Sequence, residues 1–199
     1  GAAALLRRAL AVVLALAVGA AAAWWYAQRE GLAPPPGTMT AADVAFLTDL
    51  LLVQSTTAEA LDRVEGRVED AQLASLVAAI AATETDERAT LRRWIDEAPV
   101  TAKVADGHAG THTGGHGGHA PPAVADERIL GALATATGTQ LRTLLSSVLL
   151  AHQQASAELA QDALPRLGDP EVRAYAERVV ESRRGQVQLL LSLQQQPTG

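Results

Sequence analysis

The sequence has no cysteine, one lysine, one methionine and six aromatic residues among its 199 positions. The lack of cysteine excludes disulfide bonds, thiolate metal sites and a lipidated cysteine. The scarcity of aromatic residues disfavours β-sheet, because strands are enriched in aromatic and β-branched side chains. The apolar residues are mostly Ala, Leu and Val, of which Ala and Leu have high helix propensity. The composition therefore predicts an all-α fold.

The net charge argues against nucleic-acid binding, and the absence of catalytic motifs argues against an enzyme. The formal net charge is -6 and the basic residues form no stripe, so nucleic acid is not expected as a partner. The chain has no Gly-x-Ser-x-Gly elbow, no phosphate-binding loop and no Glu-x-x-His motif of di-iron helical bundles. We therefore expect a protein that is not an enzyme.

The N-terminal segment, residues 1–30, has the pattern of a membrane anchor or a signal sequence. Arg7 and Arg8 precede an uncharged apolar run that ends in Trp24-Trp25-Tyr26, an order that places the rest of the chain outside the cytoplasm. We predict a retained transmembrane helix of a single-pass plasma-membrane protein, and the alternative is cleavage after the small residues 21–23. Residues 31–41 contain three consecutive prolines and are expected to form an extended spacer.

The remaining chain shows two helical hairpins, over residues 42–99 and 126–199. Apolar residues recur at helical spacing in both, and the second is expected to break near Gly138. Residues 70–80 align with residues 169–179 at an offset of about 99, which indicates a duplication. Because neither hairpin can bury its apolar stripe alone, the two are predicted to pack as a four-helix bundle. The charged positions of the last helix, Arg183 among them, are interpreted as its solvated face.

The connector between the hairpins, residues 100–125, loses helical periodicity and is rich in Gly and His. We expect a flexible segment that could bind copper or zinc weakly, because ordering a Gly-rich loop is entropically costly. The alternative is a solvated hinge without a ligand. The candidate ligands in this connector are His108, His112, His116 and His119.

His152 is the remaining histidine and lies in the middle of an apolar helix. One interpretation is a core histidine hydrogen-bonded to a neighbouring helix. The other is a residual metal ligand that needs partners from other helices, since its own helix supplies none. The carboxylates considered as such partners are Glu59, Glu84, Glu87 and Glu158.

Several motifs resemble the bacterial family known as domain of unknown function 305. They are the Asp-x-x-Phe pattern at residues 43–46, the helix 148–160, the run 169–180 and the His-Gly connector. The resemblance implies a ferritin-like bundle of duplicated hairpins outside the cytoplasm, with paired His and Met residues suspected of handling metals, copper among them.

The residues that the resemblance implies are only partly present. The His-His pair of each repeat corresponds here to Ala151-His152 and Val53-Gln54. The Gln and Glu positions of the following helix correspond to Glu84 and Glu87 in the first repeat and to Arg183 and Gln186 in the second. Two functions are therefore expected as alternatives. One is low-affinity copper or zinc handling, and the other is an accessory module that binds a membrane complex or a cell-envelope partner.

Overall fold

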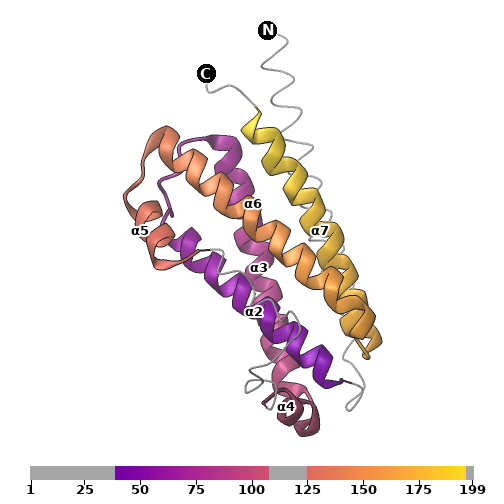
Figure 1. The fold of residues 1–199 in the computed structure, drawn as a ribbon. Coiled ribbons are helices and arrows are strands. Elements are labelled where there is room, and N and C mark those ends of the chain that lie inside the picture. Colours follow the sequence, from indigo (N-terminus) through magenta and orange to yellow (C-terminus); the bar gives the residue numbers. More distant parts are fainter. Residues whose placement is uncertain (1–38, 108–124, 196–199) are drawn as a thin grey trace, which may run out of the picture.

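The computed structural model describes residues 39–107 and 125–195, and over these ranges the chain is helical without strands (Figure 1). The predicted all-α architecture is thereby confirmed. The expected membrane anchor, the spacer up to residue 38 and the four connector histidines lie outside the described residues. The described elements are α2 (Ala41–Asp62), α3 (Ala71–Glu97), α4 (Val100–Gly107), α5 (Glu127–Thr135), α6 (Gly138–Ala163), the short 3-10 helix η2 (Leu164–Arg166) and α7 (Pro170–Gln194).

Aspartate side chains cap the starts of α3, α5 and α7. Asp70 and Asp169 each accept hydrogen bonds from two backbone N–H groups in the first turn of the helix, and Asp126 accepts one from Ile129. These N–H groups have no partner within the helix, so each cap stabilises its helix by about 1 kcal/mol. The long helices form two hairpins. In the first, α2 packs on α3, and in the second, α6 packs along α7 (Figure 1).

The connector is shorter than the sequence pattern predicts, because α4 occupies residues 100–107. Pro99 does end α3, yet its carbonyl also accepts hydrogen bonds from Ala102 and Lys103 and so begins a new helical turn. Ala102 is buried in the core, and Nζ of Lys103 donates to the carbonyl of Asp96 at 2.7 Å. These contacts hold a segment that is too short to show periodicity of its own.

The helix break expected near Gly138 is present. Helix α5 ends at Thr135, and Gly138 has a φ of 51°, in the left-handed region that glycine adopts most readily. Arg67, from the first hairpin, donates hydrogen bonds to the carbonyls of Leu133 and Ala136 at this break. The turn after α2 is therefore joined to the kink between α5 and α6.

The interior contains two apolar clusters. The first is built around Trp94 and Tyr175, whose rings lie 5.4 Å apart in an edge-on arrangement. The second is built around Ile80, Leu145 and Leu190 at the other end of the bundle. Each cluster draws side chains from both hairpins, so neither hairpin has a separate core.

Helix α2 is long and apolar enough to cross a membrane by length and composition, and it is the one such helix among the described residues. Half of its most apolar stretch is covered by the rest of the bundle. It also carries three buried polar residues, namely Asp43, Gln54 and Thr57. We therefore interpret α2 as a core helix of the bundle.

The two hairpins are joined at one end through the carboxylate of Asp43. This carboxylate accepts hydrogen bonds from the backbone and hydroxyl of Thr40, and also from the backbone N–H groups of Gly168 and Asp169. It thus completes a capping box with Thr40, the N-cap residue of α2, and fixes the turn that precedes α7. A hydrogen-bonded contact across about 125 residues of sequence sets the relative position of the two hairpins at this end.

We predict that Gly168→Ala destabilises the protein, by about 1–3 kcal/mol in the free energy of unfolding. A Cβ at this position would lie 2.5 Å from Cγ2 of Thr40, so the junction would have to move apart. Gly185→Ala is the matched control, because a Cβ in that part of α7 meets nothing within 4 Å. It should stabilise by about 0.5–1 kcal/mol, since alanine is the better helix former. Urea unfolding of both variants measures this, and equal effects would contradict the close contact.

Candidate functional site: a buried polar layer in the bundle

A layer of polar side chains crosses the middle of the bundle and separates the two apolar clusters. All four long helices contribute to it, each at a point between its contacts to the first cluster and its contacts to the second. Its buried members are Gln54 and Thr57 of α2, Glu84 and Glu87 of α3, His152, Gln153 and Ser156 of α6, and Arg183 of α7. Polar groups in such a position are costly unless they bond to one another.

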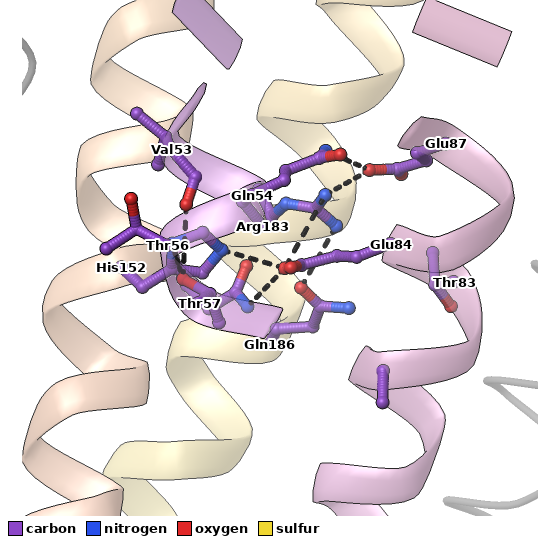
Figure 2. Close-up of polar contacts among 12 residues, drawn as sticks. Val53, Gln54, Thr56, Thr57, Thr83, Glu84, Glu87, His152, Arg183 and Gln186 are labelled. Atoms are coloured by element: carbon purple, nitrogen blue, oxygen red, sulfur yellow. Dashed lines mark hydrogen bonds and ion pairs between the residues drawn. The ribbon is translucent and has the colours of Figure 1, made fainter. Parts of the chain in front are cut away.

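His152 is fully buried and is held by two other helices (Figure 2). Its Nε2 lies 2.8 Å from Oε1 of Glu84 on α3, and its Nδ1 contacts Oγ1 of Thr57 on α2. The Thr57 hydroxyl also lies 3.4 Å from the carbonyl of Val53. It can therefore donate to a neutral imidazole, or accept from a protonated one while donating to that carbonyl.

Arg183 is the second basic group of the layer and is also fully buried. Its Nη2 contacts Oε2 of Glu87 and lies 3.9 Å from Oε1 of Glu84, while its Nη1 donates to Gln186 at 3.3 Å (Figure 2). Nε2 of Gln54 donates to the same oxygen of Glu87 at 2.6 Å. The guanidinium therefore lies between two carboxylates of α3 that are one helical turn apart.

The two carboxylates differ in their pKa. Burial disfavours the charged form of Glu84, but the charge and hydrogen bond of His152 and the charge of Arg183 outweigh this and lower its pKa. Burial raises the pKa of Glu87, against the attraction of Arg183 and with added repulsion from Glu84. Burial by itself would lower the pKa of Arg183, yet the two glutamates raise it. Glu84 is thus the more strongly ionised of the two acids.

The layer contains several atoms without a hydrogen-bond partner among the described residues. They are Oε2 of Glu84, Oε1 of Gln54, Oε1 of Gln153, Oγ of Ser156 and Nε of Arg183. Three of these are carboxylate or amide oxygens, which can only accept hydrogen bonds or bind a cation. Unsatisfied acceptors at the centre of a folded bundle are uncommon and call for an explanation.

The predicted metal ligands are not brought together in the described residues. His152 contacts Glu84, as one of the sequence hypotheses requires, but both of its ring nitrogens are engaged by protein groups. Glu59 lies on the surface and pairs with Arg63, and Glu158 is exposed. Within residues 39–107 and 125–195 no group of three or more His, Cys, Asp or Glu side chains is arranged to hold a metal ion. The helix-borne residues therefore do not fit the metal centre that the family resemblance implies.

The sequence interpretation of Arg183 is wrong, because this residue lies in the core rather than on a solvated face. It follows Val179 by four residues and precedes Leu190 by seven, so it belongs to the inward stripe of α7. This spacing is the signal that identifies it. Thr57 and Gln153 were also missed, since nothing in their local sequence distinguishes them from solvated residues.

These features define a class: a four-helix bundle of two hairpins with a closed acid–base layer across its core. The chain belongs to the family described as domain of unknown function (DUF305), whose model matches residues 43–194.

Solved structures of two family members resemble the chain. One is a presumed secreted DUF305 protein from Streptomyces coelicolor, with a TM-score of 0.63 and 20% identity, over 76% of this chain and 91% of that one. The other is a DUF305 fragment from Deinococcus radiodurans, with a TM-score of 0.58 and 18% identity, over 80% of this chain and 97% of that one. At these identities the likeness shows the fold alone. No curated protein matches the chain.

Proposed function

We propose that this protein is a non-enzymatic helical-bundle protein held outside the cytoplasm by its N-terminal segment, and that it binds copper or zinc weakly through its connector histidines. The observation that carries this proposal is the closed polar layer. Both ring nitrogens of His152 are engaged, and a guanidinium lies between the two nearest carboxylates. The other imidazoles of the sequence are the four between α4 and α5.

The chemistry of the connector supports the same proposal. Four imidazoles within residues 108–119 are separated by two or three small residues, mostly glycine, which would let the chain wrap around a cation without steric hindrance. Ordering such a segment costs about 1–2 kcal/mol per residue in backbone entropy, so the affinity is modest. Weak uptake and release of a cation suits a metal buffer, whereas catalysis requires a fixed geometry.

A related protein described as presumed secreted and the apolar N-terminal pattern both support an extracytoplasmic location. The Arg pair before the apolar run and the aromatic residues after it favour a retained anchor. Separation of membrane and soluble fractions from cells that express the full chain tests this part. Release of the intact chain into the soluble fraction would contradict the anchor.

We predict that replacing all four connector histidines by alanine weakens copper and zinc binding by at least about tenfold, equivalent to about 1.4 kcal/mol. Isothermal titration of protein purified without an affinity tag measures this. His152→Gln is the matched control, because it also removes an imidazole but lies in the closed layer, and it should leave the connector affinity unchanged. Circular dichroism checks that both variants are folded.

Two results would contradict the proposal. One is metal binding of unchanged strength in the variant with four alanines. The other is loss of binding in the His152→Gln variant while its helical content is retained.

The second candidate function is a module that binds a membrane complex or an envelope partner. The closed layer supports this function as well. Because the polar groups of the core bond to one another, a partner would bind at the surface of the bundle. Leu52 and Val100 are large apolar side chains exposed on that surface, at 57% and 73%. Extraction in mild detergent followed by co-purification tests it, and a protein that always elutes alone would count against this function.

A further inference from the structure

The centre of the bundle contains an arginine between two buried carboxylates and beside a buried imidazole. Glu84 and Glu87 lie on one face of α3, and the imidazole of His152 faces them from α6 (Figure 2). Carboxylate oxygens and imidazole nitrogens are the ligands that zinc and similar divalent ions prefer. Here Nη2 of Arg183 contacts Glu87 and lies 3.9 Å from Glu84, so a positive charge is already in place.

The need for this charge follows from burial. The two carboxylates are almost completely inaccessible, and two negative charges one helical turn apart in the core repel each other. The cost of burying them is offset when a cation lies between them. A guanidinium suits this role because its planar fork can serve two carboxylates and because it stays protonated when buried.

The duplication shows where the cation comes from. At an offset of about 99 residues, Glu84 and Glu87 of the first hairpin correspond to Arg183 and Gln186 of the second. The equivalent position is thus acidic in one copy and basic in the other, and the two side chains meet at the centre of the bundle. The second hairpin supplies the positive charge that the acids of the first hairpin require.

The unsatisfied acceptors give an independent indication. Oε2 of Glu84, Oε1 of Gln54 and Oε1 of Gln153 are buried without a hydrogen-bond partner among the described residues. A guanidinium has its donors in one plane, so it cannot serve acceptors on every side. A spherical metal ion has no such restriction. Nε of Arg183 is also without a partner among the described residues, so it is the fixed plane of the guanidinium, rather than a lack of donors, that leaves these acceptors unserved.

We propose that Arg183 is a tethered cation that takes the place of a divalent metal ion between Glu84 and Glu87, so that the bundle folds without metal. Glu84, Glu87 and His152 are not arranged as a metal site while the guanidinium lies between them, and its removal lets these three side chains close on a zinc-like ion as ligands. The inference is independent of metal binding by the connector, because the two involve different residues.

The test uses the full chain with its four connector histidines replaced by alanine, so that any bound metal must be elsewhere. In this background, zinc or EDTA should leave the melting temperature unchanged. Arg183→Ala should melt lower in EDTA and gain about 5 °C or more with excess zinc, since a ligand that binds the folded state stabilises it. The gain should disappear when Glu87→Gln is added.

Arg184→Ala is the matched control, because this neighbouring arginine is exposed and bonds Gln161 on the surface. It should show no zinc-dependent change. If Arg183→Ala does not fold in EDTA, refolding from denaturant with and without zinc decides. The Arg183→Glu variant is refolded with and without zinc as well. It places at position 183 the acid that the first hairpin has at the equivalent position, Glu84.

Folding that requires zinc, or a zinc-dependent rise in melting temperature, supports the proposal. A folded Arg183→Ala variant that is indifferent to zinc overturns it, as does failure of both variants to refold in zinc. Stabilisation of the unaltered layer by zinc would also overturn it, because Arg183 would then not exclude the metal. None of these results depends on whether the connector binds metal.

Discussion

Asp43→Ala is expected to lower the free energy of unfolding by about 2–4 kcal/mol. The substitution removes the Asp43 half of the capping box, whose bonds to Thr40 contribute about 1 kcal/mol, while Thr40 remains the N-cap residue. It also leaves the buried backbone N–H of Asp169 without its acceptor, at a cost of about 1–3 kcal/mol, whereas the N–H of the exposed Gly168 can turn to water. Urea denaturation followed by circular dichroism measures the loss. The effect is large because one carboxylate serves both hairpins.

Two variants show whether the loss comes from the shared carboxylate. Asp43→Asn keeps one acceptor oxygen but presents an amide donor towards Thr40, so it should cost less, about 1–2 kcal/mol. Asp62→Ala removes an exposed aspartate at the other end of α2 and should change stability by less than about 0.5 kcal/mol. Similar losses for Asp43→Ala and Asp62→Ala would rule out the junction as their cause.

The sequence predicts most of the fold because the features that determine it are local. Asp70 and Asp169 mark helix starts through bonds to residues two and three positions ahead, and apolar spacing identifies the inward faces. The duplication inferred from the sequence adds the predicted pairing of the hairpins. The segment 100–107 is missed for a related reason, since a helix of eight residues depends on packing rather than on its own pattern.

The polar layer could not be assembled from the sequence in the same way. His152 meets Glu84 across 68 residues and Thr57 across 95, and no local pattern encodes either contact. Arg183 is hidden for another reason, because arginine is rarely buried without a partner and its partner lies 96 residues earlier. Its helical spacing from Val179 indicates an inward position, but only the position of Glu87 makes a buried charge plausible.

The charged groups of the layer are divided between the two hairpins, and this division favours one way of pairing them. The first hairpin carries both buried acids, and the second carries the buried arginine and histidine. Pairing of two first hairpins would bring four carboxylates together without a cation, whereas pairing of unlike hairpins balances them. The layer thus favours association of the two halves of one chain, at the cost of burying charge.

The two glutamates of the layer are expected to respond to pH in opposite directions, and Glu84→Gln has the larger effect at neutral pH. Removing Glu84 leaves His152 and Arg183 without one of their acceptors, which should cost on the order of 3 kcal/mol. Because the pKa of Glu84 is lowered on folding, its ionised form stabilises the native state above about pH 4.5. That contribution is lost as the pH falls through its folded pKa.

For Glu87 the sign is reversed. Its pKa is raised on folding, so between about pH 4.5 and its folded pKa the native state holds a proton that the unfolded state has released. The stability of the parent protein relative to Glu87→Gln should therefore fall as the pH rises above 4.5. Relative to Glu84→Gln it should instead rise with pH just below 4.5 and then stay constant. Unfolding free energies from urea titrations between about pH 3 and 8 distinguish the two. Parallel curves would mean that Arg183 holds both carboxylates equally, and the asymmetry of the layer would then be wrong.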